Sequence, residues 1–221
     1  MIAENLALLR KSIPMDKVTV IAVTKTQPPE VVREAYASGL TIVGENRVQE
    51  AVEKAASLTD LPLEWHLIGH LQTNKVKQAV SLFSLIHSVD SARLAIEIDR
   101  YAKSAGKIQN VLLQINVAGE QTKSGIALTQ ADELVTIIES LDHLRLCGLM
   151  TIAPFYEDQE QTRPVFREMR SIFERIKRKV SHTESFRWLS MGMTHDYIVA
   201  VEEGANMVRI GTGLFGVRSA R

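Results

Sequence analysis

Short apolar stretches rich in β-branched residues alternate along the chain with longer stretches in which apolar residues recur every three or four positions. The first pattern is typical of buried strands and the second of amphipathic helices. Eight strands are predicted, over residues 18–24, 41–45, 63–69, 84–89, 110–117, 144–152, 187–191 and 207–210. Helices are predicted over residues 2–11, 29–38, 47–57, 74–81, 91–105, 129–140, 160–180 and 195–203.

Residues that commonly begin or end helices agree with these boundaries. Ser91 and Thr129 stand at the start of two predicted helices, where a side-chain hydroxyl can cap a backbone N–H group. Gly39 and Gly106 follow the ends of two others, where a left-handed turn is expected.

The regular alternation of strand and helix predicts parallel strands joined by right-handed crossovers, with helices covering the sheet. Eight such units in 221 residues leave about 28 residues for each, which suits a compact (β/α)8 TIM barrel. We therefore expect a single α/β barrel domain over residues 1–221, with an extra helix at its N-terminus. A doubly wound open sheet is the alternative, because a strand count from sequence can be wrong by one or two.

Composition narrows the class of protein. Lys and Arg number 26, as do Asp and Glu, so the formal charge is zero, and we expect no binding to nucleic acid or anionic lipid. No run approaches the roughly 18 consecutive apolar residues of a membrane span, and the first residues lack an export signal. Cys147 is the single cysteine and has no partner for an internal disulfide. These features predict a cytoplasmic protein that does not bind membranes.

In a parallel barrel, functional residues gather in the loops that follow the carboxyl ends of the strands. Five of these loops are polar or rich in glycine, and they cover residues 24–26, 44–47, 69–75, 190–194 and 209–213. The last of them opens the string Gly211-Thr212-Gly213-Leu214-Phe215-Gly216, which has the G-x-G-x-x-G pattern. Only five residues follow it, too few for the rest of a dinucleotide-binding unit, so we reject that function.

The glycine-rich loop fits a phosphate site better. Barrels frequently hold phosphate between the loops after strands seven and eight, which here contain Ser190 and Thr212. Arg209 lies within the last strand and points either into a polar barrel mouth or out to solvent. The alternative is that Gly211 and Gly213 simply turn the chain.

Lys25 directly follows the buried strand 18–24, so its amine has apolar surroundings on at least one side. Loss of hydration favours a neutral amine, and a neutral amine attacks an aldehyde to form a Schiff base. The alternative is a lysine whose charged end reaches solvent. A Schiff-base lysine that faces a phosphate site would suit pyridoxal 5'-phosphate (PLP), which carries both an aldehyde and a phosphate.

Other chemistries have weaker support. His66 and His70 are four residues apart but lie at a strand end, so they lack the helical geometry of a zinc pair, and we expect no metal site. Ser190 is not in a G-x-S-x-G turn, which argues against a serine hydrolase. The helix over 160–180 carries many basic residues, which we interpret as a solvated face, with a partner-binding surface as the alternative.

Six blocks of residues together resemble the pyridoxal phosphate homeostasis protein family. They run from the first strand to the last: Ala22-Val23-Thr24-Lys25, Gly44-Glu45-Asn46-Arg47-Val48-Gln49-Glu50, Trp65-His66-Leu67-Ile68-Gly69-His70-Leu71-Gln72-Thr73-Asn74-Lys75, Gly148-Leu149-Met150-Thr151-Ile152, Leu189-Ser190-Met191-Gly192-Met193 and Val208-Arg209-Ile210-Gly211-Thr212. One departure is Thr194-His195-Asp196, where many relatives have Ser-Asp-Asp/Glu.

The resemblance implies a barrel of the alanine racemase type, which is fold type III among PLP proteins. It implies that Lys25 forms a covalent aldimine with PLP and that Asn46 lies near the cofactor ring. Arg209 would lie near the pyridine nitrogen or the phosphate. Ser190, Gly211 and Thr212 would hold the phosphate, and Met191 would be a further cofactor contact.

The resemblance also implies a monomeric protein without catalytic residues, concerned with PLP supply, vitamin B6 and amino-acid balance. PLP-dependent apoenzymes are then candidate acceptors of the cofactor. An arginine beside the pyridine nitrogen disfavours a protonated ring, which makes the cofactor a poorer electron sink. The rival hypothesis is a PLP-dependent amino-acid racemase or lyase that uses Lys25 as its base.

Overall fold

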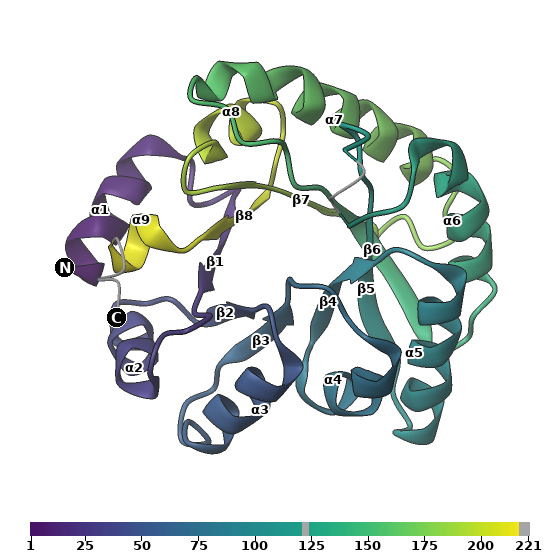
Figure 1. Cartoon of the computed structure of the whole chain (residues 1–221), viewed down its shortest axis with the longest axis horizontal. Coiled ribbons are helices and arrows are strands. Elements are labelled where there is room, and N and C mark those ends of the chain that lie inside the picture. The colour runs from purple at the N-terminus through teal and green to yellow at the C-terminus, as the bar shows by residue number, and fades with distance from the viewer. Residues whose placement is uncertain (121–123, 217–221) are drawn as a thin grey trace.

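The computed structural model describes residues 1–120 and 124–216. Eight parallel strands form a closed barrel in chain order, and helices form a ring outside it (Figure 1). The strands are β1 Thr19–Val23, β2 Ile42–Glu45, β3 Glu64–Leu67, β4 Leu85–Val89, β5 Gln109–Gln114, β6 Leu144–Met150, β7 Trp188–Met193 and β8 Met207–Ile210. The α-helices are α1 Ile2–Ser12, α2 Pro29–Ala37, α3 Val48–Ala56, α4 Val76–Leu82, α5 Ala92–Ser104, α6 Ala131–Glu139, α7 Arg163–Lys177, α8 Tyr197–Glu202 and α9 Thr212–Phe215.

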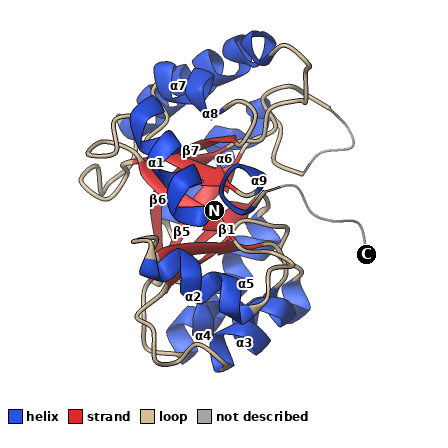
Figure 2. Cartoon of the chain, turned by 90° about the vertical axis from the view of Figure 1, so that its left-hand side faces the viewer, coloured by secondary structure: helices blue, strands red, loops and turns tan. Residues whose placement is uncertain are grey.

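The predicted barrel is confirmed, and the doubly wound sheet is wrong. Strand β1 pairs in parallel with β8, with Thr19 opposite Met207 and Ala22 opposite Ile210, so the sheet closes on itself. Each strand lies within three residues of its predicted ends. The extra N-terminal helix is also present, as α1. It lies beside α9 in both views (Figures 1 and 2), and Asn5 joins the two helices by donating a hydrogen bond to the carbonyl of Leu214 at 2.9 Å.

Local signals account for most helix ends. The Ser91 hydroxyl accepts the N–H of Leu94 at 3.3 Å and so caps α5. Gly39 and Gly106 have φ values of +94° and +64°, as expected for left-handed turns after a helix. Thr129 does not cap a helix, because a 3-10 turn over Leu128–Gln130 precedes α6. Two further 3-10 turns, Thr73–Lys75 and Gln159–Thr162, precede α4 and α7.

Two apolar regions stabilise the barrel. The larger lies between the helices and the outer face of the strands, and the smaller fills the barrel interior with six buried side chains: Ile21, Leu85, Leu112, Cys147, Met150 and Met207. Because side chains alternate between the two faces of a strand, the interior also receives Arg209, two residues after Met207. Arg209 therefore lies in the barrel interior, next to the carboxyl-end rim.

The longest helix, α7, buries an apolar stripe that includes Phe166, Met169 and Ile172. Several of its basic residues form ion pairs within the chain: Arg163 contacts Glu203 at 3.0 Å, and Arg175 contacts Asp132 at 2.5 Å. This pairing supports our interpretation of a solvated face. None of the helices in the described residues is long and apolar enough to cross a lipid bilayer.

Candidate cofactor site

A cavity of about 310 Å³ lies at the carboxyl-end rim of the barrel. Because all eight strands are parallel and the sheet is closed, their following loops meet at this rim. Five of the seven site residues predicted from sequence line the cavity, namely Lys25, Asn46, Arg209, Gly211 and Thr212. The other lining residues are Val23, Ile68, Ile152, Met193, Thr194 and His195. The structure thus brings a primary amine, an amide, a guanidinium and two hydroxyls to one cavity.

Ser190 and Met191 are not among the lining residues; both are fully buried. Strand β7 was expected to end at residue 191, but it continues to Met193, with a register irregularity where it pairs with β8. The hydroxyl that reaches the rim therefore belongs to Thr194. Cofactor contacts by Ser190 and Met191 stay a prediction.

Thr194 was not predicted as a site residue. Its Oγ1 accepts the backbone N–H of Gly211 at 3.3 Å and that of Gly213 at 3.1 Å. Two accepted hydrogen bonds leave the hydroxyl proton of Thr194 to be donated to a ligand. This contact joins the loops after β7 and β8, as expected for a barrel phosphate site. The sequence signal that could have identified Thr194 was its place in Thr194-His195-Asp196, the string that departs from the family pattern Ser-Asp-Asp/Glu.

Arg209 supplies a buried positive charge beneath the cavity. Its side chain is 3% exposed and donates to Ser190 Oγ at 2.7 Å and to the carbonyl of Thr151 at 2.9 Å. Burial lowers the pKa of Arg209 to about 10, and the carboxylate of Asp196 opposes that change. The guanidinium therefore stays charged at neutral pH and is held in place by two hydrogen bonds.

Lys25 is partly exposed at the end of β1, and a buried network holds the residue before it. Lys54 Nζ donates to the carbonyl of Thr24 at 2.7 Å and to Glu45 Oε1 at 2.6 Å, and the Thr24 hydroxyl donates to the same carboxylate oxygen at 2.7 Å. Burial raises the pKa of Glu45, while its hydrogen bond to Lys54 acts in the opposite direction. This ion pair anchors the backbone from which Lys25 extends.

The residue after Lys25 is held from the other side. Thr26 has φ of +62° and is the only non-glycine with positive φ among the described residues. A left-handed conformation costs a β-branched residue roughly 1–2 kcal/mol. The N–H of Thr26 donates to a carboxylate oxygen of Glu50, and Glu50 is also 3.2 Å from Lys54 Nζ. The same buried lysine thus links both ends of the Lys25 turn.

Asn46 is placed by close packing between two loops. A Cβ atom at Gly69 would overlap the backbone carbonyl of Asn46, so the loop after β3 can approach the loop after β2 only because residue 69 is glycine. Among the other lining residues, His195 donates from Nε2 to the carbonyl of Tyr156 at 2.8 Å and packs against the ring of Phe155. His195 was not predicted from the sequence.

A family model described as the N-terminal domain of alanine racemase matches residues 1–219. Alanine racemase from Clostridium difficile has the same fold, with a TM-score of 0.77 at 15% identity over 99% of this chain and 57% of the racemase. Fold and family model together define the barrel as one of the alanine racemase type.

Closer relatives narrow the family. The pyridoxal phosphate homeostasis protein of Aquifex aeolicus is 48% identical over 198 residues, which cover 90% of this chain and 86% of the relative. That of Escherichia coli is 37% identical over 229 residues, which cover 98% and 97%. This chain therefore belongs to the pyridoxal phosphate homeostasis protein family, as its sequence motifs indicated.

Solved structures of PipY from Synechococcus elongatus are similar over the whole barrel. The structure without PLP has a TM-score of 0.91 and 42% identity, and it covers 98% of this chain and 100% of PipY. The structure with PLP bound has a TM-score of 0.89 and 41% identity over the same shares. PipY is thus a homologue of this chain.

Proposed function

We propose that this protein binds PLP in the rim cavity, as an aldimine on Lys25, and serves PLP homeostasis without catalysing a reaction of its own. The observation that carries the proposal is the convergence of Lys25, Arg209 and the Thr194 and Thr212 hydroxyls on one cavity. Its volume of about 310 Å³ lies within the range of small-molecule sites, roughly 300–1,000 Å³. The PLP bound to PipY supports the same assignment.

Each part of the cavity suits one part of PLP. Lys25 supplies the amine for the aldehyde, and its turn is held by the buried Lys54 network. The hydroxyls of Thr194 and Thr212, beside the glycine-rich loop, are donors for phosphate oxygens. Arg209 lies beneath the cavity and directs its charge toward the ring, and Asn46 completes the ring contacts.

Two features of the cavity support the absence of a catalytic role. The charge of Arg209 disfavours a protonated pyridine nitrogen, so the ring withdraws electrons weakly. None of the described lining residues is a carboxylate, the group that stabilises a protonated ring in stronger PLP catalysts. Racemisation would also need a second acid or base facing Lys25 across the cofactor.

The alternative function, an amino-acid racemase or lyase, has one observation in its favour. His195 lines the same cavity as Lys25, and imidazole is the side chain best suited to exchange protons near neutral pH. Incubating the PLP-loaded protein with L-amino acids in deuterated water separates the two functions. We expect no PLP-dependent exchange of the α-proton; exchange that His195→Ala abolishes would establish the enzyme instead.

Binding itself is tested by adding PLP to the purified protein and following the absorption of the aldimine. The wild-type protein should develop it, and Lys25→Ala should not. Lys77→Ala, an exposed lysine on the outer helix α4, is the matched control and should behave as wild type. Failure of the wild-type protein to develop the absorption would refute the proposal.

We further propose that the protein is a cytoplasmic monomer that passes PLP to PLP-dependent apoenzymes. A partly exposed Lys25 at an open rim is consistent with transfer to another protein. Mixing the PLP-loaded protein with an apoenzyme should restore that enzyme's activity faster than the same concentration of PLP released into solution. Equal rates would show that transfer occurs only through the free cofactor.

A further inference from the structure

A chain of four hydrogen bonds crosses the barrel interior below the rim cavity. Arg209 Nη1 lies 2.7 Å from Ser190 Oγ, and Ser190 Oγ lies 3.1 Å from His87 Nδ1. His87 Nε2 lies 3.1 Å from His66 Nδ1, and His66 Nε2 lies 2.9 Å from Glu64 Oε1. The chain links strands β8, β7, β4 and β3, so it forms only when the barrel is closed.

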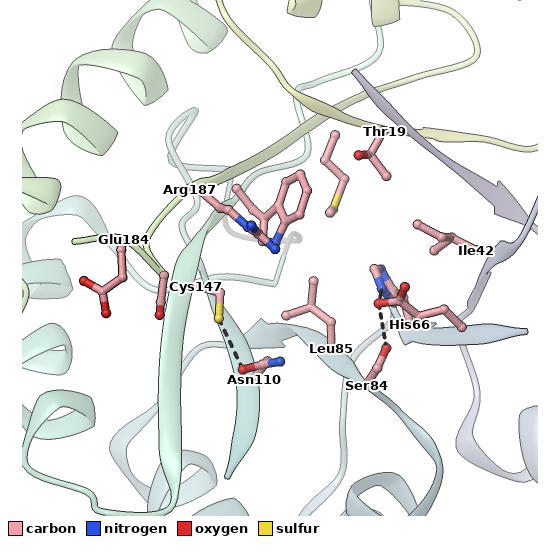
Figure 3. A pocket seen from close by; sticks show the side chains of 13 residues that line it. Thr19, Ile42, His66, Ser84, Leu85, Asn110, Cys147, Glu184 and Arg187 are labelled. Carbon is pink, nitrogen blue, oxygen red and sulfur yellow. Dashed lines mark hydrogen bonds and ion pairs between the residues drawn. The ribbon is translucent and has the colours of Figure 1, made fainter. Parts of the chain in front are cut away.

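The far end of this chain opens into a second pocket, at the amino ends of the strands. This lower pocket has a volume of about 540 Å³ and is lined in part by Glu64, His66, Asn110, Cys147 and Trp188 (Figure 3). Glu64 is half exposed there and also accepts a hydrogen bond from Ser84 at 3.1 Å. The three central members of the chain, in contrast, are buried to at least 99%.

With one proton on each histidine ring, the two ends of the chain set the direction of every hydrogen bond. A guanidinium can only donate, and an ionised carboxylate can only accept. His66 then donates from Nε2 to Glu64 and accepts at Nδ1 from His87. His87 then accepts at Nδ1 the hydroxyl proton of Ser190, which itself accepts from Arg209.

The electrostatics of the buried rings agree with this assignment. Burial is the main reason that the pKa of His87 lies well below its ordinary value, so the ring is neutral. The hydrogen bond from His66 lowers the pKa of Glu64, which keeps that carboxylate ionised. Reversing the chain would leave the bare Nε2 of His66 facing a carboxylate unless a proton were added there.

Aligned in this way, the chain acts on Arg209. Each hydrogen bond presents its negative end toward the guanidinium, and successive bonds polarise one another in a water-excluded interior. Arg209 is otherwise bound by the carbonyl of Thr151 and attracted by Asp196. The two histidines thus stabilise a charge that neither of them contacts directly.

We propose that His66 and His87 are positioning residues of the cofactor site, which hold Arg209 charged and fixed beneath the cavity by donating in series from Ser190 to Glu64. The part of this inference that concerns the bound cofactor rests on the proposed function. Neither histidine is among the residues that line the cavity. Their role is to set the environment that the ring of PLP meets.

The first test uses the protein without PLP. Long-range ¹H–¹⁵N spectra of histidine-labelled protein distinguish the two neutral tautomers from the protonated ring. We expect His66 and His87 both to be neutral with the proton on Nε2, and we expect His87→Leu to shift the guanidinium resonances of Arg209. A proton on Nδ1 of His87, a protonated His87 ring, or unchanged Arg209 resonances would overturn the proposal.

The second test uses PLP as the probe. Ser190→Ala removes one hydrogen bond to the charged Arg209 and should weaken PLP binding about tenfold. His87→Leu removes the acceptor of the Ser190 hydroxyl proton and should also weaken PLP binding. Both variants should alter the absorption of the bound cofactor. His87→Gln, which can still accept and donate, should restore most of the affinity. Ser88→Ala is the matched control, because the Ser88 hydroxyl is buried on the same strand without a hydrogen-bond partner among the described residues.

Wild-type affinity and absorption in His87→Leu and Ser190→Ala would overturn the positioning role. If His87→Leu fails to fold, Ser190→Ala gives the same comparison at almost unchanged volume. A wild-type protein that fails to bind PLP would refute the proposed function, whereas the tautomers and the Arg209 resonances would still decide the role of the histidines.

Discussion

Replacing Lys54 by methionine tests the network that holds the Lys25 turn. Lys54 is 5% exposed and pairs with Glu45, which is fully buried. The replacement keeps most of the side-chain volume but removes the hydrogen bonds of Nζ to Glu45, to Glu50 and to the carbonyl of Thr24. It also leaves the carboxylate of Glu45 buried without its cation.

The expected loss is large because only one partner of a buried pair is removed. Such changes cost about 3–5 kcal/mol of the free energy of unfolding, whereas an exposed pair contributes about 1 kcal/mol or less. Urea unfolding followed by circular dichroism measures the difference. The double variant Lys54→Met with Glu45→Gln should recover part of the loss, because it no longer buries an unpaired charge.

The control is Lys77→Met on the outer face of α4, which should change the free energy of unfolding by less than about 0.5 kcal/mol. A loss below about 1 kcal/mol in Lys54→Met would refute the reasoning, since the pair would then behave like one at the surface. A double variant less stable than Lys54→Met would also contradict it.

Three further changes test other parts of the barrel. Gly148 has φ of +149°, and a Cβ atom there would overlap a carbonyl of β7, so Gly148→Ala should lower the free energy of unfolding in urea by about 3 kcal/mol. Gly106 has open space around it, so the control Gly106→Ala should lower it by only about 1 kcal/mol. The hydrogen bond from Arg175 lowers the pKa of Asp132 in the folded protein. The wild-type protein should therefore be more stable than Asp132→Asn above about pH 3.9, the ordinary pKa of an aspartate. This difference should vanish as the pH falls through the lowered pKa of the folded protein. Burial raises the pKa of the Cys147 thiol to about 11, so at pH 8 it should react with a thiol reagent about two hundredfold more slowly than in the unfolded chain.

Most of the fold could be predicted from the sequence because strand and helix alternate without interruption. Strands buried on both faces form continuous apolar runs, so even the four-residue β8 was found at its observed ends. Helix α9 was missed, because a glycine-rich string carries the signals of a loop. Barrel closure itself depends on the pairing of Thr19 with Met207, which no local pattern reveals.

The residues of the candidate site could be predicted where the sequence placed the end of the preceding strand correctly. Lys25 and Asn46 follow strands whose ends were placed within one residue, and both line the cavity. Strand β7 was expected to end just before Gly192, but it continues to Met193, and Gly192 adopts a φ of +91° within it. Ser190 was consequently expected at the rim, where Thr194 lies.

The two interior histidines had no usable signal in the sequence. His66 and His87 each lie within a short apolar run, and a run buried on both faces does not show which positions face the barrel interior. Only the register of the closed sheet places them on the same side as Ser190 and Arg209. The polar residues that face a barrel interior are therefore identified from the pairing of the strands rather than from the pattern of apolar residues in the sequence.

Reductive trapping tests directly whether Lys25 carries PLP. The protein is incubated with PLP, reduced with borohydride to make the linkage permanent, digested and analysed by mass spectrometry. We predict one pyridoxyl adduct, on Lys25. If the protein gains no adduct, or if the adduct maps to another lysine while Lys25 stays unmodified, Lys25 does not carry PLP.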